Sequence, residues 1–400
     1  MSLLDKVLAY WPVLTGGVFF LALGLWLRLS AARAAERKPK SLEWVRNYRS
    51  SSFPFRNEVF GTPKLQWAAL LVVLFFAALV SYGAILAPGM DSTHFLKTVF
   101  GTRYVILRIL VYTLGAGAVF FLLETLSDSP WAAMPAALIF AASQIHGHAV
   151  SCFLAAGLFL LLLYLRQERT DFAGELPYLG ACLLFAPMIT LLPGMIWLAV
   201  CFVAAHWWKL FHYYRTGSCS GRNLIWAAVA AVVVWILVIV LAAALHWFLL
   251  MQFRLSGFLS GLKPSELRSG IAFILRESVL CFRIPRLGMA AELLLDAPLL
   301  GFGFWGLFSA WTLGVRRRNA RGIFVLSVCA ALGLFWLVTG RYQLTLPLAM
   351  AASCVLADAE LGNKRWICIV MAATGVCWYL LLEIGAWSIP LTEGVRYRLR

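Results

Sequence analysis

Long apolar runs, separated by short polar stretches, dominate the chain. A helix needs about 20 mostly apolar residues to cross the hydrocarbon core of a bilayer. The pattern therefore predicts an all-α protein, a polytopic transmembrane helical bundle of about 12 spans. In chain order the runs are Leu8–Leu29, Trp67–Pro88, Tyr104–Leu126, Trp131–Ile145, Ala149–Leu165, Leu176–Thr190, Leu191–Trp208, Asn223–Met251, Pro298–Val315, Ile323–Val338, Tyr342–Ala357 and Trp366–Trp387.

The composition points the same way. Hydrophobic side chains make up 62% of the 400 residues and charged side chains 13%, whereas a soluble domain has about 45–50% and about 25%. This excludes a soluble enzyme, a disordered chain and a disulfide scaffold. Most of the nine cysteines lie inside apolar runs and none forms a Cys-x-x-Cys pair, so we interpret them as apolar packing residues and predict no metal site from them.

Basic residues set the expected orientation and domain organisation. Residues 28–64 hold nine basic side chains, which predicts a cytoplasmic loop. We therefore expect residues 1–65 to form an extra N-terminal span with this loop, 66–358 a transmembrane core, and 359–400 the last span and an outer tail. The same rule explains most of the excess of 34 basic over 18 acidic residues without nucleic acid as a partner.

Two connections, 89–103 and 252–297, are expected on the outer face. The second holds six basic residues, against the usual bias toward the inside, and its prolines suggest short interfacial helices. One would begin at Pro264-Ser265-Glu266, and another would be bounded by Pro285 and Pro298. In the next span, Gly301-Phe-Gly303-Phe-Trp-Gly306 fits a dinucleotide-binding pattern, but no strand precedes it, so we predict close helix packing instead.

The first outer loop supplies the leading catalytic candidate. Asp91 is its only acidic residue, and in a helix it would share a face with His94. The alternative is that Asp91 caps an interfacial helix. Charges inside spans are few (Arg108, His246 and Glu383) and are expected toward the outer half. The expected outer face gathers further candidates for binding a phosphate-bearing, membrane-bound substrate: His94, Lys97, Arg103, His146, His148, Arg254, Arg283, Arg341 and Tyr342.

The order of these features resembles the GT-C superfamily of membrane glycosyltransferases, and is similar to its protein mannosyltransferase and aminoarabinose transferase branches. An outward span ends in an acidic outer loop with Asp91, and a return span and a short inner turn, Ser127–Pro130, follow. An Ala-rich outward span, Trp131–His148, and a late Arg341-Tyr342-x-x-x-x-Pro347 complete the order. The resemblance covers roughly residues 66–358.

The resemblance implies an enzyme of the cytoplasmic membrane of a bacterium or archaeon, with its active face outward. It would move a sugar from a polyprenyl-phosphate donor to a lipid, glycan or protein acceptor, with Asp91 as the base and Arg341, Arg103, Arg254 or Arg283 on the leaving phosphate. No cofactor is expected; a divalent metal is left open, because many relatives have two acids in this loop. Two alternatives stay open: a transporter or lipid or polysaccharide flippase, which places ionisable groups near the bilayer midplane, and a non-catalytic scaffold subunit.

Overall fold

The computed structural model describes fourteen stretches of the chain, and all of them are essentially helical, with no strand among the described residues. These are residues 15–16, 18–26 and 29, and then 63–86, 91–127, 130–143, 149–166, 172–216, 221–250, 263–281, 297–316, 319–339, 344–357 and 365–383. The prediction of an all-α protein is confirmed for this part of the chain.

Each predicted apolar run contains described helical residues, and α12 lies between two of these runs. Helical residues 18–26 come first. After them come α3 (Pro63–Leu86), α4 (Asp91–Ser127), α5 (Pro130–Ser143), α6 (Ala149–Arg166), α7 (Phe172–Leu183), α8 (Phe185–Leu191), the short η1 (Pro193–Met195), α9 (Ile196–Arg215), α10 (Gly221–Leu250), α12 (Pro264–Leu280), α14 (Ala297–Trp311) with η2 (Thr312–Arg316), α15 (Ala320–Thr339), α16 (Thr345–Ala357) and α17 (Arg365–Glu383).

Seven helical segments among the described residues are long and apolar enough to cross a membrane, and four more are apolar but shorter. The seven are Ile106–Ser127, Ala149–Arg166, Gly174–Leu191, Pro193–Arg215, Ile225–Leu249, Ala297–Val315 and Ala320–Thr339. The protein is therefore an integral membrane protein with several spans. The count of about 12 spans stays a prediction.

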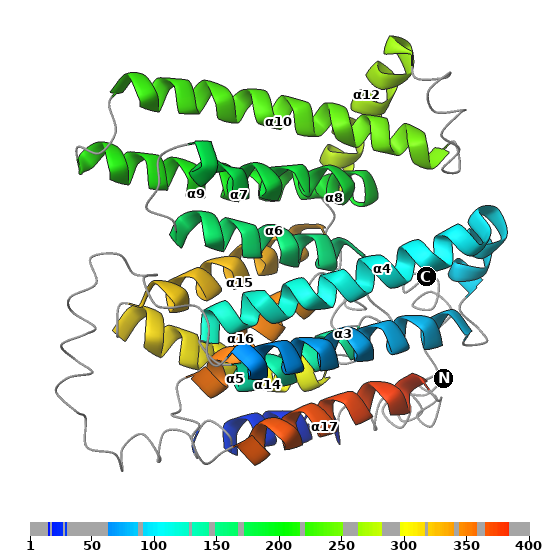
Figure 1. Ribbon diagram of the computed structural model, residues 1–400, viewed down its shortest axis with the longest axis vertical. Coiled ribbons are helices and arrows are strands. Elements are labelled where there is room, and N and C mark those ends of the chain that lie inside the picture. Colours follow the sequence, from blue (N-terminus) through cyan, green and yellow to red (C-terminus); the bar gives the residue numbers. More distant parts are fainter. Residues whose placement is uncertain are drawn as a thin grey trace, which may run out of the picture.

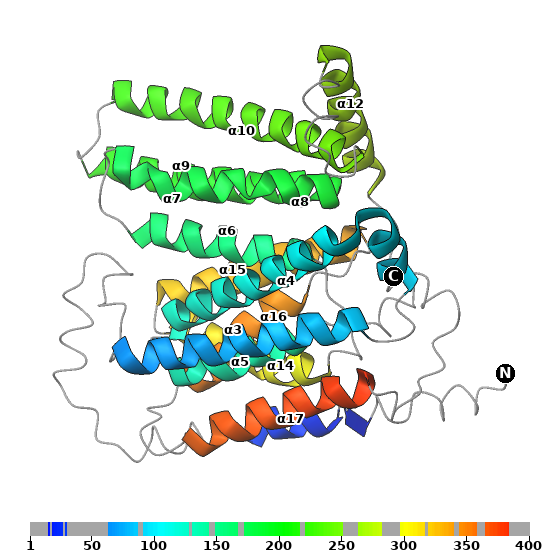
Figure 2. The same cartoon turned by 45° about the vertical axis from the view of Figure 1, so that its right-hand side comes forward.

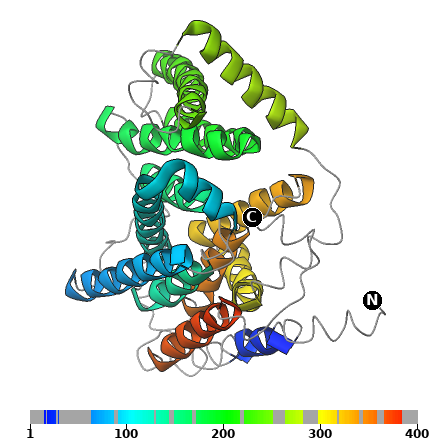
Figure 3. The same ribbon diagram turned by 90° about the vertical axis from the view of Figure 1, so that its right-hand side faces the viewer.

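The long helices lie side by side in one bundle, with α10 at one edge and α17 at the other (Figure 1). One end of this bundle, where α3 ends, α4 begins and α12 lies, is named the α12 end. Helix α12 does not run along the bundle but across it, as the turned views show (Figures 2 and 3). The α12 end is the end that the distribution of basic residues predicts to be the outer one.

Prolines explain why α7 and α8 are separate although they belong to one candidate span. Pro187 has no N–H to bond the carbonyl four residues earlier, and its ring crowds that carbonyl. The helix accordingly breaks at Leu184, whose N–H still reaches Gly180 O at 3.2 Å. Pro193 ends α8 in the same way and opens η1. The runs 176–190 and 191–208 are thus two separate candidate spans, as predicted.

Glycines allow α14 and α16 to pack backbone against backbone. A Cβ atom on Gly303 would lie 2.9 Å from the Leu348 carbonyl oxygen, and one on Gly306 would overlap the Ala351 carbonyl. Gly301 lies equally close to the main chain of Phe20. The Gly-x-Gly-x-x-Gly pattern is therefore a helix-packing device, as its position inside an apolar run predicts.

Candidate functional site

Helix α4 is much longer than a membrane span. Its 37 residues extend for roughly 55 Å at 1.5 Å per residue, against about 30 Å for the hydrocarbon core. In the sequence its apolar part begins only at Tyr104. The first thirteen residues of α4, which begin with Asp91, therefore continue beyond the apolar span at the α12 end.

Four of the expected site residues, Asp91, His94, Lys97 and Arg103, lie in this extension. The segment is not a separate short helix but part of α4. Helical geometry places residues 91 and 94 within about 60° of each other around the axis, and residue 103 about 120° from residue 91. Their side chains lie outside the part of the structure that is described, so a shared site stays a prediction.

The other expected site residues lie outside the described part of the chain altogether: His146, His148, Arg254, Arg283, Arg341 and Tyr342. What the structure places at the α12 end is the backbone of the α4 extension and the whole of α12. No group of three or more His, Cys, Asp or Glu side chains that could hold a metal ion occurs among the described residues.

Helix α12 begins at Pro264, as the sequence predicts, and has a buried side and an exposed side. Gly270 and Ser278 are buried, with Gly270 against Ala243 of α10. Trp197 Nε1 donates to Ser278 O at 3.0 Å and ties α12 to the start of α9. On the outward side, Arg268 and Arg276 are exposed, and so are the apolar residues Phe273, Leu275, Val279 and Leu280. A helix that crosses the bundle end with exposed cations and apolar side chains has the character of an interfacial helix.

A buried polar cluster at the opposite end of the bundle was not expected. It is formed by Tyr164 near the end of α6, Glu175 near the start of α7, and His206 and Lys209 on α9. Lys209 is 2% exposed and His206 3%. The expectation that in-span charges are few and lie toward the outer half is therefore wrong, because these residues belong to the candidate spans and lie at the other end.

Short contacts join the members of this cluster. Lys209 Nζ donates to Tyr164 O at 2.6 Å and lies 3.6 Å from the centre of the Tyr164 ring. The Tyr164 hydroxyl shares a hydrogen bond of 2.8 Å with His206 Nδ1. Glu175, whose side chain is 28% exposed, places Oε2 3.8 Å from the same nitrogen. The Tyr178 ring stacks on His206 at 4.2 Å between centres.

A second buried polar pair lies near the same end, between α3 and α4. Gln66 Nε2 donates to Glu124 Oε2 at 2.8 Å. Glu124 is 2% exposed, and its other oxygen, Oε1, is buried with no hydrogen-bond partner among the described residues. Together with the cluster around Lys209, this pair shows that both ends of the bundle carry ionisable groups.

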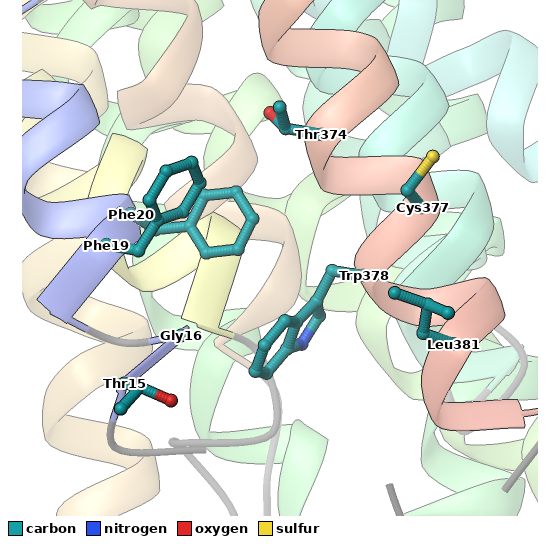
Figure 4. A pocket seen from close by; sticks show the side chains of 8 residues that line it. All are labelled: Thr15, Gly16, Phe19, Phe20, Thr374, Cys377, Trp378 and Leu381. Carbon is teal, nitrogen blue, oxygen red and sulfur yellow. The ribbon is translucent and has the colours of Figure 1, made fainter. Parts of the chain in front are cut away.

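An apolar cavity of about 370 Å³ lies between residues 15, 16, 19 and 20 on one side and α17 on the other (Figure 4). Its lining is mostly apolar, with Phe19, Phe20, Trp378 and Leu381 around it, and Thr15 and Thr374 are also among the lining residues. It holds no ionisable group except the Cys377 thiol, so it suits a hydrocarbon chain and lacks the groups for acid–base or phosphate chemistry.

No family model matches the chain, and neither a curated protein nor a solved structure matches it. The class of the protein accordingly follows from its own structure. It is an all-helical integral membrane protein with several spans, one long helix that continues beyond its apolar part, and an amphipathic helix across the same end.

Proposed function

We propose that the protein is a membrane glycosyltransferase of the GT-C type that uses a polyprenyl-phosphate sugar as donor. The observation that supports this best is the α4 extension. It begins at Asp91 and continues beyond the apolar span at the same end as α12, where Arg268 and Arg276 are exposed. An acidic helix start and a cationic interfacial helix then face the same aqueous boundary, where a membrane-bound, phosphate-bearing donor presents its headgroup.

In this mechanism Asp91 takes the proton of the acceptor hydroxyl as that oxygen attacks the anomeric carbon of the sugar. The bond from this carbon to the donor phosphate oxygen breaks, with inversion, and the polyprenyl phosphate leaves. Arg341, with Arg103, Arg254 and Arg283, is assigned to the charge that develops on the leaving phosphate. The acceptor is a lipid, a glycan or a protein.

The first experiment identifies the donor. Native mass spectrometry of the purified protein is expected to detect a co-purified polyprenyl-phosphate sugar. That donor is then used in a transfer assay, for which Asp91→Asn is the test variant and Asp128→Asn, in the predicted inner turn, the matched control.

Asp91→Asn is expected to lower the transfer rate by about 10²- to 10⁴-fold, the contribution of a general base, while Asp128→Asn keeps the rate of the wild-type protein. Asn is also a good helix cap, so a purely structural Asp91 would be replaced with little loss. Full activity of Asp91→Asn would therefore contradict the proposed mechanism. A protein without any bound donor or transfer activity would favour the scaffold alternative.

The buried cluster of Glu175, His206 and Lys209 favours a second candidate function, a transporter. Ionisable groups inside spans often line ion or substrate pathways. Reconstitution in liposomes distinguishes the two functions. In a transporter, Glu175→Gln would abolish uptake of the substrate and Asp91→Asn would not; in the proposed enzyme, Asp91→Asn abolishes transfer, and Glu175→Gln does not.

A further inference from the structure

Arg108 is an ionisable residue inside a span that the mechanism above does not use. It lies three residues into the candidate span Ile106–Ser127, at the α12 end, and is 9% exposed. Its neighbours on the other side of α4 are strongly exposed, as expected for lipid-facing residues: Ile106, Leu107, Leu110 and Leu114. Arg108 therefore faces the interior of the bundle.

The helical register indicates which neighbour Arg108 faces. Arg108, Tyr112, Gly115 and Val119 lie on one stripe of α4, within about 60° around the axis. A Cβ atom on Gly115 would overlap the Cys152 side chain of α6, so this stripe packs against α6. Helices α4 and α6 run in the same direction, because α5 returns the chain between them.

The same register places Arg108 nearer to the α12 end than the first turn of α6 is. Arg108 precedes Gly115 by two turns of α4, whereas α6 begins at Ala149, less than one turn before Cys152. The first N–H groups of a helix have no partner within it and point along its axis. The first N–H groups of α6 therefore point toward the α12 end, where the guanidinium of Arg108 lies.

The guanidinium of Arg108 has no anionic partner in the described part of the molecule. Its Nε is buried and has no hydrogen-bond partner among the described residues. Its guanidinium lies over the Tyr112 ring, with Cζ 5.4 Å from the ring centre. Arginine stays charged in proteins, and a buried charge without a counter-ion costs folding free energy.

We infer that Arg108 and the first turn of α6 bind an oxyanion of the phosphate class, which enters the bundle between α4 and α6 from the α12 end. A guanidinium offers two parallel N–H donors to a phosphate, and a helix N-terminus adds further N–H groups and a favourable dipole. The site does not require glycosyl transfer. Only its assignment to the phosphate of a sugar donor rests on the proposed function.

The test uses the full chain in nanodiscs of dioleoyl phosphatidylcholine, with thermal unfolding followed by tryptophan fluorescence. Two probes distinguish the sources of the anion: farnesyl phosphate dissolved in the nanodiscs, and inorganic phosphate added against sodium chloride of equal ionic strength. The variants are Arg108→Gln, Arg108→Lys and the control Arg215→Gln, an exposed arginine at the other end of the bundle.

Farnesyl phosphate is expected to raise the midpoint temperature of the wild-type protein and of Arg215→Gln. Arg108→Gln should need about 10- to 100-fold more probe for the same shift, the effect of losing a charged hydrogen bond, and Arg108→Lys should lie between. An equal response to inorganic phosphate would identify a soluble anion as the ligand; a response to farnesyl phosphate alone would identify a lipid headgroup. Wild-type affinity of Arg108→Gln for both probes, or no stabilisation of the wild-type protein by either, would overturn the site.

A second measurement separates a binding site from a structural role. Without a probe, Arg108→Leu is expected to unfold at a temperature at least as high as the wild-type protein, because it removes an uncompensated buried charge. A clear loss of stability would mean that Arg108 already has a structural partner and would also overturn the site. Sugar transfer enters neither measurement, so failure of the proposed function and failure of this site are distinguishable.

Discussion

Lys209 interacts with two groups at once. One is the carbonyl of Tyr164, which belongs to the last turn of α6, where carbonyls have no partner within the helix. The other is the Tyr164 ring, whose face attracts a cation. Glu175, on the neighbouring helix α7, supplies the opposite charge of the cluster. Lys209 is thus a C-terminal cap of α6 provided by α9, and it links these two helices.

Replacement of Lys209 by methionine is expected to destabilise the protein by about 1–3 kcal/mol, because a buried carbonyl loses its donor and Glu175 its counter-charge. The loss is measured as a decrease in the thermal midpoint of the full chain in nanodiscs. Arg215→Met, on the exposed side of the same helix, is the control, and its effect should stay within about 0.5 kcal/mol.

The double variant Lys209→Met/Glu175→Gln is expected to recover part of this loss, since it removes both charges together. If the effects of the two single variants simply add, the two residues are not coupled and Lys209 acts only on the α6 carbonyl.

At the scale of single residues, the sequence predicts some members of the candidate site and misses others. Positive-inside counting finds basic residues at span ends, and the predicted run Leu191–Trp208 stops one residue before Lys209. The spacing of His206 and Lys209, three residues apart in an apolar run, was the available signal, because such a pair shares a helix face. The partner Glu175 could not be found from the sequence, since only the packing of α7 on α6 and α9 brings it near.

Helix pairs with glycine at their contact are the sensitive elements of this bundle. Gly306→Ala is expected to destabilise the protein by about 1–3 kcal/mol, the usual cost of overpacking, because its Cβ would overlap the main chain of α16 rather than a flexible side chain. The thermal midpoint in nanodiscs measures this effect.

Gly333→Ala on α15 is the matched control. No atom lies within 4 Å of a Cβ added there, and alanine favours a helix by about 1 kcal/mol over glycine. Its midpoint should be unchanged or higher. Equal losses for Gly306→Ala and Gly333→Ala would contradict a close contact between α14 and α16.

Apolar runs predict the helices well because lipid-exposed segments must satisfy their backbone hydrogen bonds internally. Helix α12 was also predicted, from Pro264 and the charges after it. The continuation of α4 back to Asp91 was not predicted. Polar residues 91–103 end the apolar pattern, whereas the backbone there is still helical. Hydropathy therefore shows where the membrane-embedded part of a helix begins, and not where the helix itself begins.

At the scale of the whole molecule, the α12 end is expected to face outward. Single cysteines at Ser92 in α4 and Ser265 in α12, introduced into a cysteine-free chain, should react with a membrane-impermeant maleimide in intact cells. A cysteine at Ser51, in the basic segment, should react only after permeabilisation, because positive charge is retained on the cytoplasmic side.

The two test positions lie at the same end of the bundle, so they should behave alike. Labelling of one in intact cells and of the other only after permeabilisation would contradict the arrangement of α4 and α12. Labelling of both only after permeabilisation would reverse the orientation and remove the basis for an outer active site.

Helix α4 carries Arg108 near one membrane surface and Glu124 near the other, sixteen residues or about 24 Å apart. A continuous helix bends little, so a tilt about its middle moves its two ends in opposite directions. A tilt of about 5° moves each of these two residues by roughly 1 Å in opposite directions over this length. Because α4 is continuous, any such rigid tilt at one membrane surface would also shift Glu124 relative to Gln66 at the other.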